Sequence, residues 1–114
     1  MAVQINFVMD QGTTFEAVAT IQNEDGSIFD LTDLTPQSQM RKSYFTNTFI
    51  TITAAIDGDP TEGNVMLSLL PSETSSIRAG RYVYDVEVHN DDDTYVKRVL
   101  QGVITVSPQV TRTV

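Results

Sequence analysis

The sequence has no cysteine, no tryptophan and a single histidine. Without cysteine there is no disulfide, no thiolate metal ligand and no thiol nucleophile, so stability must come from packing. A Ser/His/Asp or Cys/His site needs a histidine base, and His89 is the only candidate. His89 falls on the polar side of an alternating segment beside a turn, where a solvated histidine is the ordinary case. We therefore expect no catalytic residues and no enzyme activity.

Basic residues are also scarce, with seven Lys and Arg against fifteen Asp and Glu and a formal net charge of −8. This charge repels polyanions at long range, so we expect neither nucleic acid nor an anionic membrane as a partner. The pairs Arg41-Lys42 and Lys97-Arg98 are predicted to lie on solvated strand faces. Long apolar runs are missing, and the start of the chain lacks a basic segment followed by an apolar one. We expect no secretory signal and assembly in the cytoplasm.

The acidic residues offer weak sites for metal or proton chemistry. Residues 57–63 and 90–93 are rich in aspartate, but the first run lacks the glycine and the final glutamate that a Ca²⁺-binding EF-hand loop places at fixed positions. Both runs are interpreted as solvated turns. Asp85 and Glu87 share an outward strand face, which is a poor setting for an acid–base pair. We expect no metal and no cofactor.

The sequence does contain a regular succession of short β-strands. Its 114 residues, 40% of them hydrophobic, suit one domain spanning 1–114. Apolar residues alternate at period two, most clearly at Tyr82, Tyr84, Val86 and Val88. Strands are predicted at 13–22, 28–31, 37–44, 49–56, 64–70, 81–89 and 95–106, with turn formers between them and 107–114 as a C-terminal extension. Gly102 is predicted to split the last strand as a bulge or bend.

This spacing predicts an all-β fold, a sandwich of about seven to eight antiparallel strands with one short helical turn. The corner and the resemblance described next imply that the sandwich is immunoglobulin-like. The helical turn is expected within 71–77, after Pro71. Gly80, Tyr82 and Tyr84 then follow in the order found at the corner of immunoglobulin-like sandwiches, where a tyrosine hydroxyl bonds back to the backbone. Tyr82 would be the corner tyrosine. The alternative is that both tyrosines only pack their rings along the strand, without a corner hydrogen bond.

Four stretches resemble a recurrent domain of tailed-bacteriophage structural proteins, especially those of T4-like cyanophages: DQGTTF at 10–15, GSIFDLT at 26–32, AGRYVYDVE at 79–87 and GVITVSPQVTR at 102–112. Such domains also look like the N-terminal modules of upper-baseplate proteins in siphophages. The resemblance implies an immunoglobulin-like sandwich in the virion, assembled in the host cytoplasm in many copies. Its implied partners are other virion structural proteins, and it carries no catalytic motif.

Three functions remain open from the sequence. The first is a virion structural protein that docks onto larger proteins of the tail, baseplate or neck, and the second is a capsid decoration protein. The third is a carbohydrate- or cell-surface-binding module that uses Tyr44, Phe45 and Phe49. For docking by edge addition we predict the polar strand 37–44 and the tail 107–114, and the candidate residues are Met40, Arg41, Lys42, Tyr44, Val110 and Arg112.

Overall fold

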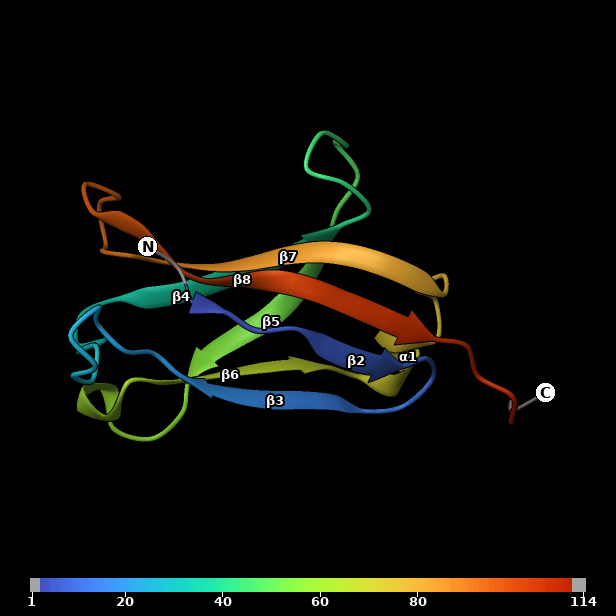
Figure 1. The fold of residues 1–114 in the computed structure, drawn as a ribbon, viewed down its shortest axis with the longest axis horizontal. Helices are drawn as coiled ribbons and strands as arrows, with labels where there is room; N and C mark the ends of the chain where they lie inside the picture. Colours follow the sequence, from blue (N-terminus) through green and yellow to red (C-terminus); the bar gives the residue numbers. More distant parts are fainter. Residues whose placement is uncertain (1–2, 112–114) are drawn as a thin grey trace.

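The computed structural model describes residues 3–111, which form two layers of β-strands packed face to face (Figure 1). No helix in this part of the chain is long and apolar enough to cross a membrane. The strands are β1 (Val3–Gln4), β2 (Phe7–Asp10), β3 (Phe15–Thr20), β4 (Thr35–Arg41), β5 (Ile50–Ile56), β6 (Asn64–Leu69), β7 (Gly80–His89) and β8 (Val96–Ser107). A 3₁₀ turn, η1 (Pro60–Glu62), and one helical turn, α1 (Pro71–Thr74), complete the fold.

The two layers belong to one curled sheet, because β5 passes from one layer to the other. In the first layer, sheet A, the order is β1 and β2 beside β8, then β7, β4 and the start of β5. In the second, sheet B, the end of β5 pairs with β6, and β6 pairs with β3. The all-β fold predicted from the alternation is confirmed.

The prediction of a wholly antiparallel sandwich is wrong at one edge. β1 and β2 run parallel to β8. The first and last strands of the chain share no hairpin, so nothing forces them to be antiparallel. Both N-terminal strands were missed from the sequence, although Ile5, Phe7 and Met9 alternate inward.

The predicted strand 28–31 is reduced to a single bridge, between Gln22 and Ile28. The structure also contains a second helical turn, η1, beside the predicted one.

The predicted edge strand 37–44 is also wrong, because β4 lies inside sheet A. It pairs with β7 over seven residues and with β5 over three. Its polar character has another cause. Gln37, Gln39 and Arg41 point to the outer face of the sheet, while Ser38 and Met40 are buried beneath it.

Gly102 does not split β8, which runs unbroken through it. The bulge lies nearby, where the register with β7 shifts between Val86 and Glu87. Gly102 instead permits a close approach of the N-terminal segment, since a Cβ there would lie 2.0 Å from the Ile5 carbonyl oxygen. Ile5 N–H donates to the Gln101 carbonyl at 2.9 Å, and Val103 N–H donates to Asn6 Oδ1 at 3.0 Å.

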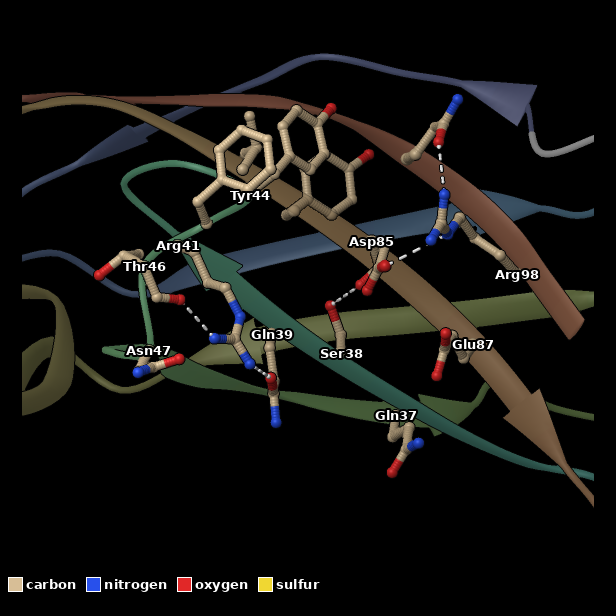
Figure 2. A pocket seen from close by; sticks show the side chains of 14 residues that line it. Gln37, Ser38, Gln39, Arg41, Tyr44, Thr46, Asn47, Asp85, Glu87 and Arg98 are labelled. Carbon is tan, nitrogen blue, oxygen red and sulfur yellow. Dashed lines mark hydrogen bonds and ion pairs between the residues drawn. The ribbon is translucent and has the colours of Figure 1, made fainter. Parts of the chain in front are cut away.

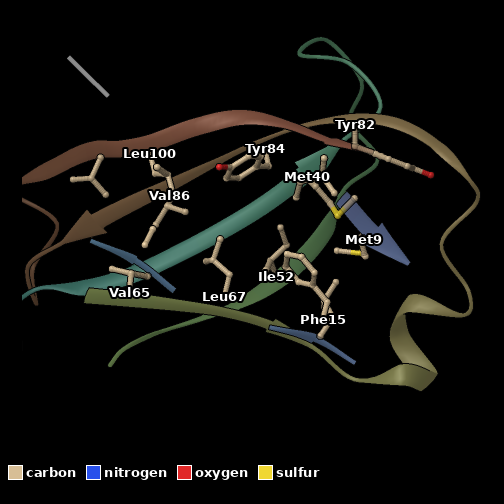
Figure 3. Close-up of a cluster of buried hydrophobic side chains, with 14 of the residues drawn as sticks. Met9, Phe15, Met40, Ile52, Val65, Leu67, Tyr82, Tyr84, Val86 and Leu100 are labelled. Atoms are coloured by element: carbon tan, nitrogen blue, oxygen red, sulfur yellow. The ribbon is translucent and has the colours of Figure 1, made fainter. Parts of the chain in front are cut away.

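The core fills the space between the sheets with the inward residues of every strand from β2 to β8 (Figure 3). From sheet A come Met40, Tyr84, Val86 and Leu100, and from sheet B come Phe15, Val65 and Leu67. Phe7 meets the Phe15 ring edge-on at 6.0 Å and lies 5.6 Å from the Tyr84 ring. Aromatic packing thus fastens β2 to both layers.

The connection from β6 to β7 has the geometry that the corner interpretation requires. The Tyr82 hydroxyl donates to the Arg78 carbonyl at 2.6 Å, four residues back along the chain. The Tyr84 hydroxyl, also buried, donates to the Ile5 carbonyl at 2.6 Å. In α1 the buried Thr74 hydroxyl donates to the Thr13 carbonyl at 2.7 Å. The Tyr82 bond thus closes the corner on itself, while Tyr84 and Thr74 tie it to the segments that contain Ile5 and Thr13.

Candidate functional site

The segment between β4 and β5, residues 42–49, projects from the sandwich (Figure 1) and is called the docking loop below. Phe45 is 95% exposed and Tyr44 is 72% exposed. The base of the loop is held by Arg41, whose guanidinium donates to the Thr46 carbonyl at 2.7 Å and lies 5.1 Å above the Phe49 ring. Its base is therefore fixed while its two aromatic side chains meet solvent.

A groove of about 510 Å³ lies between the docking loop and the outer face of sheet A. Figure 2 shows polar side chains from three strands and the loop meeting there. The outward residues of β4, β7 and β8 supply most of the lining, namely Gln37, Gln39, Arg41, Val83, Asp85, Glu87, Arg98 and Gln101. The buried residues Ser38 and Tyr84 also line it, and the loop supplies Tyr44, Phe45, Thr46 and Asn47.

Asp85 is a partly buried carboxylate in the groove. Burial is the main cause that raises its pKa, and the nearby carboxylate of Glu87 acts in the same direction. The guanidinium of Arg98, whose Nε lies 3.3 Å from Asp85 Oδ2, and that of Arg41 act in the opposite direction. Arg98 also donates to Gln101 Oε1 at 3.3 Å. The groove floor is thus a partly sheltered network of charges and amides.

Amides, carboxylates and guanidinium groups beside exposed aromatic rings can bind polar ligands or a partner's backbone. Within residues 3–111 no group of three or more His, Cys, Asp and Glu side chains could hold a metal ion. His89, at the far end of β7, has Nδ1 2.9 Å from Asp93 Oδ1 and 3.1 Å from the Asn90 carbonyl, both in the turn that follows it.

The two aspartate-rich turns use their side chains to fix backbone conformation. Asp59 caps η1 by accepting from the Thr61 N–H at 2.9 Å, and Asp92 accepts from the Thr94 hydroxyl at 2.8 Å. These hydrogen bonds hold the pKa of both carboxyl groups below the ordinary value. Each turn thus has a structural use for its acidic residue.

The predicted docking residues lie in different environments in the structure. Met40 is wrong as a docking residue, because it is fully buried in the core. Arg41 is half-buried at the groove, Lys42 is exposed at the start of the docking loop, and Tyr44 projects from it. In the tail, Val110 is 93% exposed. Arg112 lies outside the described residues.

Gln37 and Gln39 fall within the predicted docking strand 37–44, but sequence reasoning did not bring them together with Arg98 and Gln101 in one groove. The alternation along each strand indicates that Gln37 and Gln39 point outward. It does not indicate that β4, β7 and β8 are neighbours, and only that order brings these side chains together.

No family model matches the chain, and no curated protein matches its sequence significantly. Among solved structures, the crystal structure of Listeria monocytogenes InlP is similar over 93% of this chain, with 13% sequence identity and a TM-score of 0.50. A family 123 glycoside hydrolase from Clostridium perfringens matches 94% of this chain at 10% identity, with a TM-score of only 0.42. The chain spans 28% and 23% of the lengths of these two proteins. The likeness to InlP supports the fold alone.

Proposed function

We propose that this chain is a non-enzymatic structural protein of a tailed-phage particle, and that it docks onto a larger particle protein of the tail, baseplate or neck. The docking loop and the groove beneath it form the contact surface. The phage assignment rests on the four sequence stretches at 10–15, 26–32, 79–87 and 102–112. The observation that supports docking is the exposure of Phe45 and Tyr44, side by side on one projecting loop.

Two exposed aromatics on a held loop are suited to anchoring a partner. An aromatic side chain buries about 150–250 Å² in an interface and forms a large share of its binding energy. Beside Tyr44 and Phe45, Asn47, Gln39 and Glu87 supply hydrogen-bonding groups, as the polar rim of an interface does. The loop and groove together thus have the parts of a protein-binding surface.

Cryo-electron microscopy of the particle that contains this chain tests the assignment. We expect density for the sandwich at the tail, baseplate or neck, with the docking loop against a neighbouring protein. Density on the capsid faces alone would refute this position in favour of decoration. Absence of the chain from purified particles, checked by mass spectrometry, would refute the virion assignment itself.

A glycan-binding module is the second candidate, favoured by one observation. The groove combines the Tyr44 and Phe45 rings with the side chains of Asp85, Gln101 and Asn47, and sugar sites pair stacking rings with planar hydrogen-bonding groups. A glycan array probed with the purified chain separates the two. Saturable binding that is lost in Tyr44→Ala/Phe45→Ala would favour this candidate, and an empty array would remove it.

A further inference from the structure

The charges of the molecule are divided between its two ends. The loops 21–34, 57–63 and 90–95 gather at one end of the long axis (Figure 1) and are called the acidic end. Ten of the fifteen acidic residues lie in these loops: Glu24, Asp25, Asp30, Asp33, Asp57, Asp59, Glu62, Asp91, Asp92 and Asp93. A net charge of −8 is therefore concentrated mainly at this end.

A pocket of about 360 Å³, called the basic pocket, lies toward the other end, between the docking loop and the start of β7. Arg41, Lys42 and Arg78 line it, and none of its lining residues is acidic. Lys42 Nζ lies 4.8 Å from the centre of the Tyr82 ring, and no ion pair within residues 3–111 engages Lys42 or Arg78. This pocket thus presents unneutralised positive charge on an acidic protein.

Both ends also carry apolar surface. The half-exposed Phe49 ring forms one wall of the basic pocket, with Ile50 and Ile77 beside it. Ile28 and Tyr95 are exposed among the loops of the acidic end. The molecule measures 31 × 26 Å across its long axis. This cross-section is the upper limit of an end-on contact, and it is comparable with the roughly 800 Å² per partner of a standard interface.

We infer that the basic pocket binds the acidic end of a second copy of this chain. Opposite charges meet in this arrangement, while the alternatives, acidic end to acidic end or pocket to pocket, bring like charges together at a cost. The contact joins two different surfaces, so each copy keeps one free acidic end and one free pocket. Head-to-tail association of this kind gives rings or open chains of copies.

Two charge-reversed variants test this inference. Lys42→Glu/Arg78→Glu removes the positive charge of the pocket and leaves the acidic end intact. Asp57→Lys/Asp91→Lys alters the acidic end at two exposed residues whose side chains make no hydrogen bond or ion pair within residues 3–111. The matched control for the acidic-end variant is Asp10→Lys/Glu16→Lys, which makes the same change of charge at exposed positions on β2 and β3.

Sedimentation velocity from about 10 µM to about 1 mM, a range that covers weak association, gives the readout. The wild-type chain and the control should increase in average mass with concentration. Each pocket or acidic-end variant should associate at least about tenfold more weakly, because attractive contacts become repulsive ones. A mixture of the two variants should regain association, because the intact acidic end of one meets the intact pocket of the other.

A wild-type chain that stays monomeric up to about 1 mM would overturn the inference. So would a mixture that stays monomeric, because only a head-to-tail contact is restored by mixing. If the wild-type chain is monomeric but binds a glutamate-rich peptide through Arg78, the occupant is an acidic segment of another protein. A monomeric chain could still dock on a particle, so this result is separate from the proposed function.

Discussion

The corner between β6 and β7 and the docking loop between β4 and β5 treat their aromatic residues in opposite ways. At the corner, Tyr82 and Tyr84 are buried, and each hydroxyl donates to a backbone carbonyl. On the docking loop, Tyr44 and Phe45 are exposed, and only the base of the loop is fastened. The corner aromatics therefore hold the sandwich together, while the loop aromatics are free to contact a partner.

The two regions expose their aromatic residues to different surroundings within one small domain. Buried aromatics at the corner are explained by packing alone. Exposed aromatics on the docking loop add nothing comparable to stability, and adjacent exposed aromatics are typical of interaction sites. The sharpest tests of this difference compare the same substitution in the two regions.

Alanine substitution should give the largest contrast. Tyr84→Ala removes a buried ring and its bond to Ile5, and should lower the free energy of unfolding by about 3–5 kcal/mol. Phe45→Ala removes a ring that is almost wholly exposed, so it should change stability by less than about 0.5 kcal/mol. Urea denaturation followed by circular dichroism measures both. Similar losses for the two variants would abolish the distinction.

Gly102→Ala should be the next most harmful change. Its Cβ would clash with the Ile5 carbonyl, the acceptor of the Tyr84 hydroxyl, and should cost about 1–3 kcal/mol. Faster hydrogen exchange of the β1 and β2 amides would show that the N-terminal segment is released. Gln101→Ala, at an outward position of the same strand, is the control. Unchanged exchange in Gly102→Ala would argue against the close approach.

Tyr82→Phe isolates a single hydrogen bond. Loss of the bond to the Arg78 carbonyl should lower the free energy of unfolding by about 1–1.5 kcal/mol. Tyr44→Phe removes the same hydroxyl from an exposed ring on the docking loop and should leave stability unchanged. Chemical denaturation of the two variants side by side gives the answer. An unaffected Tyr82→Phe would mean that the corner bond does not stabilise the fold.

Asp85→Asn should give the smallest effect, and it depends on pH. Because the folded protein raises the pKa of Asp85 above 3.8, the folded state binds its proton more tightly than the unfolded chain. Wild-type stability therefore falls as pH rises through the interval between 3.8 and the raised value. The asparagine variant should be more stable at pH 7 by less than about 1 kcal/mol, since Asp85 is partly exposed and pairs with Arg98.

The gain from Asp85→Asn should disappear once the pH lies below the ordinary value of 3.8, where wild-type Asp85 is neutral in both states. Urea denaturation at pH 3 and pH 7 compares the two conditions. A variant that is less stable than the wild type at pH 7 would show that the ion pair with Arg98 outweighs burial.

Local pattern was sufficient to predict the strands that are apolar on one side. In β6 and β7, inward residues such as Val65 and Val86 alternate with outward ones, and the structure has the same register. Apolar residues also alternate along the N-terminal segment, but β1 and β2 were not predicted. These strands are short, and their parallel partner β8 lies at the other end of the chain. Pairing of that kind leaves no local signal.

The candidate site was only half predictable for the same reason. Tyr44 and Phe45 stand out in a polar segment, so they could be selected from the sequence. The error over β4 arose because outward polar residues such as Gln37 look like those of an edge strand, when they line a groove in the middle of sheet A. Strand order, which depends on long-range pairing, distinguishes the two.

Incorporation of the Tyr44→Ala/Phe45→Ala variant into phage particles tests the central claim most directly. Val8→Ala/Val18→Ala, which truncates exposed apolar side chains on β2 and β3, is the matched control. We expect the loop variant to fold with wild-type stability and to be lost from purified particles, while the control is incorporated normally. Incorporation of the loop variant at the wild-type level would contradict the proposal that this loop is the docking surface.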